Sequence, residues 1–216
     1  MTEQHQALDL IANTRAMRRL KPDPIPDELL QQILIAGLCA PSGGNRQNWG
    51  FIVLKDRHIK QDIQRYYKRA FDEVVGPNYQ SSEPPAGVSK AQYQRQHEAV
   101  AYLTDHFHEA PVWIVACLDS GNTRPGMGSG ASIYPAVQNM LLAARSLGLG
   151  ATLTTRHLLY ADEVDRLLKL PQGVHSYAIV PLGYPLGRFG SVSRRPVAEV
   201  VFSDSWGTPL TYLNPD

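Results

Sequence analysis

The stretch Ala40-Pro41-Ser42-Gly43-Gly44-Asn45-Arg46-Gln47-Asn48-Trp49 separates two segments of different periodicity. Before it, apolar residues recur at helical spacing up to Leu38, which predicts an amphipathic helix with Asp27 as its N-cap. After it, Trp49 to Leu54 is a short apolar run rich in aromatic and β-branched residues, which predicts a buried strand. The stretch itself therefore predicts a helix-to-strand connection, and its Pro, Ser and Gly residues suit a turn.

The same turn also has the chemistry of a ligand contact. Its paired glycines let the backbone approach a bound molecule closely, because no Cβ stands in the way. Asn45 and Gln47 offer amide donors and acceptors, which suit a flat heterocycle with alternating C=O and N–H groups. An ordinary turn and a small-molecule contact both fit these residues.

Composition narrows the class of protein. A chain of 216 residues is most economically one domain. With 21 Lys and Arg against 20 Asp and Glu, the net charge of +1 gives no reason to expect nucleic acid or an acidic membrane surface as a partner. Cys39 and Cys117 stand in apolar surroundings, which predicts buried thiols rather than a disulfide framework. The polar N-terminus has no apolar leader-like run, so we expect a cytoplasmic protein.

A cluster of positively charged residues precedes the turn at residues 40–49. Arg15, Arg18 and Arg19 lie within five positions, and arginine forks bind phosphate bidentately. A solvated basic surface, or a basic module that binds polyanions, fits the same cluster.

The remaining elements follow from periodicity and turn residues. The pattern predicts helices over residues 4–16, 57–75, 91–108, 132–147 and 161–170, and strands over 111–118, 149–156 and 177–185. Because Pro135 fits a helix only in the first turn, Ser132 is the expected N-cap. Residues 76–90 are expected to form a long turn-rich loop. No His, Cys or carboxylate spacing suits a metal site, so none is expected.

Four segments in order carry a resemblance to a known family. Residues 40–49 resemble the Ala-Pro-Ser-x-x-Asn-x-Gln-Pro-Trp signature of the flavin-dependent nitroreductase family, with Asn48 in place of Pro. Residues 15–20 resemble its Arg-Ser-x-Arg-x-Phe segment, with Ala16 in place of Ser and Leu20 in place of Phe. Residues 139–150 resemble Asn-x-x-Leu-Ala-Ala-x-x-Leu-Gly-Leu-Gly, and residues 183–185 with the following basic segment resemble its Gly-Tyr-Pro ending.

The resemblance implies a fold and an assembly. The expected fold is α+β, with a central mixed or antiparallel sheet flanked by helices, in a single domain over residues 1–216. It also implies a homodimer with FMN at the subunit interface. Residues of about 76–110 would form a variable lid. The apolar tail, residues of about 196–216 with Trp206 and Tyr212, would wrap the partner subunit.

The resemblance also implies the residues of the site. Contacts to the FMN phosphate and ribityl chain would come from Arg15, Ala16, Arg18 and one of Arg194 and Arg195. Backbone groups at Thr154, Thr155 and Arg156 would face flavin N5 and O4. The turn would contribute Pro41, Ser42, Gly43, Asn45 and Gln47. Tyr79 and Tyr93 would shape substrate choice, and no side chain would act as a catalytic acid or base.

The implied activity is reduction of a small aromatic acceptor. NADH or NADPH would reduce the bound FMN, and a nitroaromatic compound would then be reduced to the nitroso and hydroxylamine stages by a ping-pong mechanism. Arg18 would stabilise negative charge near flavin N1 and O2. The same scaffold also hosts quinone reduction, halophenol dehalogenation and oxygen-dependent flavin cleavage, and a flavin-binding protein without turnover is possible too.

Overall fold

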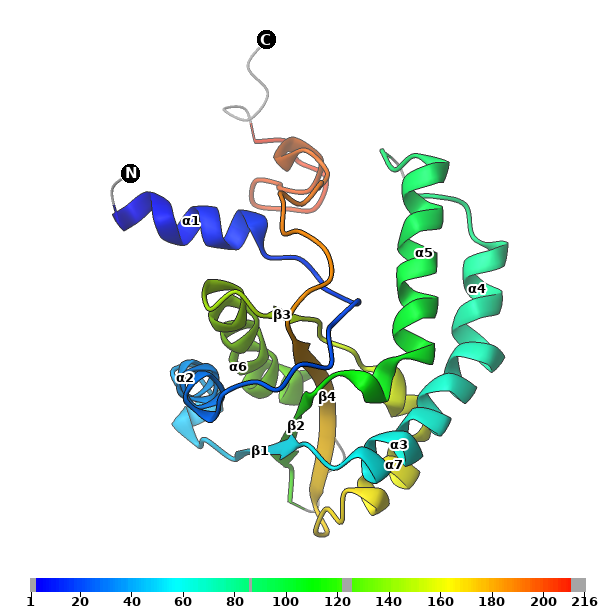
Figure 1. Ribbon diagram of the computed structural model, residues 1–216. Helices are drawn as coiled ribbons and strands as arrows, with labels where there is room; N and C mark the ends of the chain where they lie inside the picture. Colours follow the sequence, from blue (N-terminus) through cyan, green and yellow to red (C-terminus); the bar gives the residue numbers. More distant parts are fainter. Residues whose placement is uncertain (1–2, 86, 122–125, 211–216) are drawn as a thin grey trace.

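A four-stranded antiparallel sheet forms the centre of the molecule (Figure 1). The computed structural model describes residues 3–85, 87–121 and 126–210. In spatial order the strands are β1 (Trp49–Leu54), β2 (Val112–Asp119), β4 (Val174–Gly183) and β3 (Gly150–Ala151), and every pair is antiparallel. The predicted α+β class with helices flanking a sheet is confirmed, and the sheet is antiparallel rather than mixed.

The two central strands are buried on both faces. Residues 112–118 of β2 and 176–183 of β4 are all buried, which explains their nearly continuous apolar sequence. Successive side chains alternate between faces, so Ile114 belongs to one core cluster while Trp113 and Val115 belong to the other. The edge strand β1 is only half-buried, because it pairs with β2 alone.

Helices cover each face of the sheet. Helices α2 (Asp27–Leu38) and α6 (Met127–Ser146) pack together on one side (Figure 1). Helices α3 (Arg57–Ala70) and α7 (Ala161–Leu167) lie on the other. The first helix, α1 (Glu3–Asn13), extends away from the sheet.

Part of the expected loop over residues 76–90 is helical, so that prediction was wrong there. Helix α3 passes through a π-helical turn (Phe71–Val75) into α4 (Gly76–Ser81), and α5 (Lys90–Asp105) follows. Pro77 is the second residue of α4 and directly follows the π-helical turn. Figure 1 shows α4 and α5 side by side, rising from the body of the molecule.

Two predicted helix starts were also wrong. Helix α6 begins at Met127, five residues before Ser132, and Pro135 lies inside it. Gly126 is the N-cap of this helix, and its N–H donates to Ser129 Oγ at 3.2 Å. Asp27 is the first residue of α2 rather than its cap, and its carboxylate pairs with Lys55 at 2.6 Å.

The strand expected over residues 149–156 is much shorter than predicted, because β3 covers only Gly150 and Ala151. It ends after Ala151 and returns as a single antiparallel bridge between Thr154 and Ile179. A 3-10 helix then runs from Arg156 to Tyr160. The chain therefore leaves the sheet at residues 152–156, and the polar side chains there face a cavity described below.

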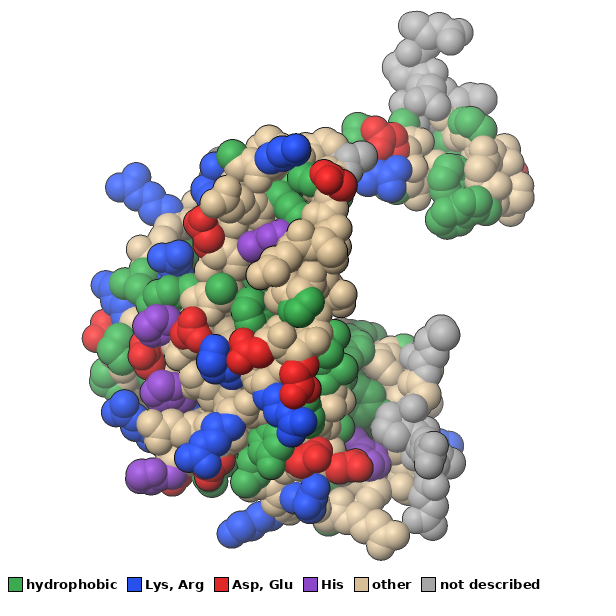
Figure 2. Space-filling view, turned by 90° about the vertical axis from the view of Figure 1, so that its right-hand side faces the viewer, with side chains coloured by type: hydrophobic (Ala, Val, Ile, Leu, Met, Phe, Trp, Pro, Cys, Tyr) green, Lys and Arg blue, Asp and Glu red, His purple; other side chains and the backbone are tan. Residues whose placement is uncertain are grey.

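Both ends of the described chain carry apolar side chains that have little cover. Leu8 and Ile11 of α1 are 67% and 55% exposed, and Trp206 is 91% exposed. Figure 2 shows hydrophobic side chains on the C-terminal lobe, which stands apart from the main body. The tail beyond residue 210, with Tyr212, lies outside the described residues.

The two cysteines differ in their surroundings. Cys117 is buried in β2, as predicted, and burial raises the pKa of its thiol to about 12. Cys39 is exposed, so its predicted burial was wrong; it caps the end of α2 beside Leu38, which is itself 52% exposed. In the described part of the chain, no helix combines the length and apolar composition needed to cross a membrane.

Candidate functional site

Backbone hydrogen bonds attach the arginine-rich segment to the edge of the sheet. The N–H of Met17 donates to Ala151 O at 2.9 Å, and the N–H of Lys21 donates to Tyr184 O at 2.8 Å. Met17 and Leu20 are buried, and a Cβ at Gly150 would lie 2.9 Å from Met17 Cβ. This close packing needs glycine at position 150, and it fixes the arginines around Met17 in place.

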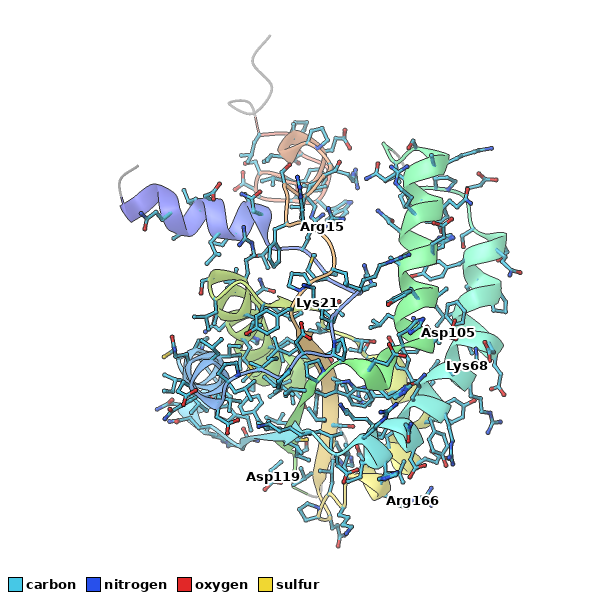
Figure 3. The ribbon with its side chains drawn as sticks, viewed as in Figure 1. Arg15, Lys21, Lys68, Asp105, Asp119 and Arg166 are labelled. Carbon is cyan, nitrogen blue, oxygen red and sulfur yellow. The ribbon has the colours of Figure 1, made fainter. Side chains whose placement is uncertain are left out.

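Two neighbouring cavities follow this segment, and we call them together the arginine furrow. One, of about 530 Å³, lies between α1 and α6, and its lining includes Arg15, Arg18, Arg145 and Arg194. The other, of about 390 Å³, lies beside α5 and shares Arg15, Arg18 and Arg194. In Figure 3, Arg15 lies above the sheet and close to the C-terminal segment.

A third cavity adjoins the furrow, and we call it the threonine cavity. It has a volume of about 390 Å³, and its lining includes Arg18, Tyr67, Tyr79, Thr154 and Arg156. Arg18, which lines all three cavities, connects the threonine cavity to the furrow.

Thr154 and Thr155 form one wall of the threonine cavity. Thr154 is held by reciprocal backbone hydrogen bonds with Ile179, at 3.0 and 2.9 Å, and its hydroxyl lies 2.9 Å from that of Tyr67. The backbone N–H groups of Thr155 and Arg156 have no hydrogen-bond partner among the described residues. Two backbone donors are therefore available at this wall.

The Arg156 side chain is fixed by three neighbours. Its guanidinium donates to Thr104 Oγ1, and the guanidinium carbon lies 4.3 Å from the Tyr67 ring centre and 5.0 Å from that of Phe71. Cation–π attraction at these distances favours this position. The guanidinium is thus held against α3, the π-helical turn and α5.

The cavities are cationic, with no acidic side chain in the described lining of any of the three. Burial lowers the pKa of both Arg18 and Arg156. Repulsion from Arg15 lowers the pKa of Arg18 further, and repulsion from Arg18 lowers that of Arg156, although both stay charged. Burial also raises the pKa of the Tyr67 hydroxyl, which therefore remains neutral. Such a site favours an anionic ligand.

The turn after α2 is a second, separate feature. Asn45 and Gln47 have left-handed backbone angles, with φ of 51° and 50°. The Ser42 hydroxyl accepts from the Gln47 N–H at 3.0 Å, and the Gly43 N–H donates to Ser132 Oγ at 3.0 Å. Non-glycine residues in this conformation are uncommon, and they occur often at ligand sites.

Within one chain, the turn and the furrow lie apart. Gly43 contacts α6 at Ser132, whereas the α6 residues that line the furrow are Gln138, Leu141 and Arg145, six to thirteen residues further along the helix. At 1.5 Å per residue these positions lie about 9 to 20 Å from Ser132 along the helix axis. The turn residues that we predicted as ligands line none of the three cavities: Pro41, Ser42, Gly43, Asn45 and Gln47.

The structure brings together most of the other predicted site residues. Those that line at least one of the three cavities are Arg15, Ala16, Arg18, Tyr79, Thr154, Thr155, Arg156 and Arg194. Arg195 lines none of them and pairs with Glu199 at 3.0 Å. Tyr93 also lies outside them, and its ring packs edge-on against His97 at 3.9 Å.

Sequence reasoning missed Tyr67 and His97. Tyr67 lies on the buried face of α3 with Ile63 and Ala70, so its helical spacing marked it only as a core residue. His97 stacks on Tyr79 at 4.2 Å and reaches the furrow from α5. No group of His, Cys, Asp and Glu suited to a metal ion occurs among residues 3–85, 87–121 and 126–210.

The sequence of this chain matches one family model and is similar to the sequences of several known proteins. A model described as the nitroreductase family matches residues 11–184. A protein of Methanothermobacter thermautotrophicus, provisionally named NADH dehydrogenase/NAD(P)H nitroreductase, is 31% identical over 182 residues, which cover 82% of this chain and 76% of that protein. Iodotyrosine deiodinase 1 of Rattus norvegicus is 25% identical over 183 residues, covering 82% of this chain and 61% of that protein.

Solved structures agree with this placement. The crystal structure of oxidized iodotyrosine deiodinase bound to FMN and 3-iodo-L-tyrosine superposes with a TM-score of 0.72 at 25% identity, covering 92% of this chain and 99% of that chain. The family model spans most of the chain, including the arginine segment, the turn and the threonine wall. The chain therefore belongs to the nitroreductase family.

Proposed function

We propose that this chain is an FMN-dependent NAD(P)H oxidoreductase that reduces nitroaromatic compounds. The observation that carries the proposal is the continuous, acid-free group of cavities around Arg18, which links a cationic furrow to the Thr154–Arg156 wall. Family membership and the names of the relatives support an NAD(P)H-linked flavin enzyme. The predicted location in the cytoplasm stays a prediction.

The residues present fit FMN. Its phosphate needs cationic donors, and Arg15, Arg18 and Arg194 face the furrow. The available N–H groups of Thr155 and Arg156 suit the N5 and O4 edge of a flavin. Ala16 provides no hydroxyl for the phosphate, so the arginines carry more of that contact.

A homodimer would complete the site. The turn with Asn45 and Gln47 lines no part of the furrow of its own chain, whose α6 residues begin about 9 Å beyond Ser132. In a twofold dimer the turn of one chain could meet the furrow of the other. The exposed Trp206 and Ile11 would gain cover in the same assembly.

The chain's own residues would bind, orient and shield the reactants. Bound FMN supplies transfer of two electrons and a proton from NAD(P)H to the acceptor. Arg18, half-buried in a cavity without acids, would stabilise negative charge on the reduced cofactor. For each NAD(P)H and proton consumed, a nitro group becomes nitroso with release of water, and a second NAD(P)H and proton give the hydroxylamine.

Reductive dehalogenation is the second candidate. It is favoured by the likeness to the iodotyrosine deiodinase structure, whose TM-score of 0.72 accompanies coverage of 99% of that chain. Quinone reduction, oxygen-dependent flavin cleavage and flavin binding without turnover are further roles that one scaffold can host, because the fold alone does not fix the reaction.

The absorbance spectrum of the purified protein, before and after NADH or NADPH is added under argon, tests the proposal. We expect flavin bands that bleach with either nucleotide and return when nitrobenzene is added. Return with a halophenol but not with nitrobenzene would favour the second candidate. A colourless protein that takes up no FMN would overturn both.

A further inference from the structure

We propose that Arg156 is a specificity-determining residue that binds the carboxylate of an aromatic acceptor. The substrates preferred by this site would then be aromatic acids that carry the reducible group. This inference rests on the proposed function and adds a substrate class to it.

Arg156 has donors to spare. Of the five N–H donors of its guanidinium, the described contacts satisfy only one, through Thr104 Oγ1. Thr104 itself donates to Val100 O at 2.9 Å, which leaves its oxygen free to accept from Arg156. The remaining donors can therefore bind a ligand without displacing a contact of the folded chain.

Arg156 also lacks a counter-ion in the described part of the chain, unlike several other arginines. Arg69 pairs with Glu73 at 2.7 Å and Arg195 pairs with Glu199 at 3.0 Å, both on the surface. Arg156 is half-buried, and no acidic side chain of the described residues lines its cavity. A partly buried charge without a partner is costly, and an anionic ligand would supply the missing partner.

Its position distinguishes Arg156 from Arg15 and Arg194, two of the three arginines that we assign to FMN, whereas Arg18 lines the threonine cavity as well. Arg15 and Arg194 face the furrow and are absent from the lining of the threonine cavity. Arg156 instead lies against Tyr67 of α3 and Phe71 of the π-helical turn. Because it directly follows Thr155, an acceptor held by its guanidinium would lie beside the proposed flavin N5.

The walls of the threonine cavity define the rest of the ligand. They include the rings of Tyr67 and Tyr79 and the apolar side chains of Val75, Leu153 and Leu159. A cavity of about 390 Å³ suits a single-ring ligand. A guanidinium binds a planar carboxylate through two parallel hydrogen bonds, so an aromatic carboxylate matches both the walls and Arg156.

Calorimetric titration of the oxidised, FMN-loaded protein tests this without turnover. The matched ligands are 4-nitrobenzoate and 4-nitrobenzamide, which differ in charge but little in shape. We expect the carboxylate to bind about tenfold or more tightly, as charge-assisted hydrogen bonds predict. Arg156→Gln should remove this preference while FMN stays bound, and Arg156→Lys should keep part of it. Arg166→Gln on the distant helix α7 is the matched control, and it should change neither value.

Three results would overturn the inference. They are equal binding of the two ligands to the unaltered protein, a preference that survives Arg156→Gln, and loss of FMN from both Arg156 variants, which would assign the residue to the cofactor. The proposed function fails separately, when the unaltered protein holds no FMN, and this inference then fails with it.

Discussion

The guanidinium carbon of Arg156 lies 4.3 Å from the centre of the Tyr67 ring, and the Tyr67 hydroxyl lies 2.9 Å from Thr154 Oγ1. One tyrosine of α3 thus contacts both ends of the threonine wall. Tyr67 is itself stacked on Phe107, with ring centres 4.1 Å apart, and is almost fully buried. The site wall is consequently supported by the core beneath α3.

Removing the Tyr67 hydroxyl should destabilise the protein. Tyr67→Phe keeps the ring under Arg156 but leaves the buried Thr154 hydroxyl without this partner. We expect the free energy of unfolding in urea to fall by about 1 kcal/mol. Tyr160→Phe, which loses an exposed hydrogen bond to Glu73, should change it by less than about 0.5 kcal/mol. Equal effects of the two substitutions would contradict the structural role of Tyr67.

Arg18→Ala should weaken retention of FMN, because Arg18 lines all three cavities. The measurement is the ratio of flavin to protein absorbance after purification and dialysis. Arg19→Ala is the control, since Arg19 is exposed and its guanidinium stacks on Tyr102 at 4.5 Å. We expect the control to retain its flavin. An Arg18→Ala protein with full occupancy would refute the assignment.

The full chain should sediment as a dimer, because the turn lines none of the three cavities of its own chain and Trp206 is 91% exposed. A chain ended at Arg195 should sediment as a monomer and hold less FMN, since the apolar tail is lost. Analytical ultracentrifugation detected at the flavin wavelength gives both quantities. A monomer with bound flavin would show that the interface prediction is wrong.

His157 should make stability fall in mildly acidic solution. It is fully buried, burial lowers its pKa from 6.5 to about 4, and neither ring nitrogen has a hydrogen-bond partner among the described residues. Between these values the unfolded chain binds more protons than the folded one, so stability declines as the pH falls through 6.5. From pH 7.5 to 5 this group should remove about 2 kcal/mol of the free energy of unfolding.

His157→Leu provides the comparison for that measurement. Urea unfolding of both proteins at pH 7.5 and pH 5 should show a smaller pH effect in the variant. At pH 7.5 the variant should be at least as stable, because it removes buried nitrogens that lack described partners. Identical pH effects in the two proteins would contradict the buried, neutral state of His157.

The sequence predicted the elements with strong periodicity and failed where local signals conflicted. The apolar run of β2 was placed within a residue at each end, because burial on both faces leaves an unbroken apolar pattern. Helix α6 was started five residues late, because Gly128 and Gly130 disfavour a helix in isolation. Tertiary packing, including the contact of Ser132 with Gly43, outweighs that preference.

For the site, sequence motifs identified the arginine segment and the threonine wall, but they did not identify the residues that hold the wall in place, such as Tyr67. Arg18 and Thr154 lie far apart in sequence, and only the resemblance joined them in advance. Tyr67 has no local mark of function, since its contact with Thr154 spans 87 positions. The Asn45 turn and the furrow contact different parts of α6. Sequence periodicity predicts that a helix is present but not where it lies relative to other segments.

The segment around Arg18 points its side chains in two directions, with Met17 and Leu20 buried in the core while Arg15 and Arg19 are exposed. Natural variation can therefore act on cofactor affinity and on fold stability at separate positions of one short peptide. A change at position 15 alters the charge presented to a phosphate and leaves the core intact. A change at position 17 disturbs the core and shifts the neighbouring arginines as well. Ligand binding can therefore be altered here without loss of fold stability only at the outward-facing positions.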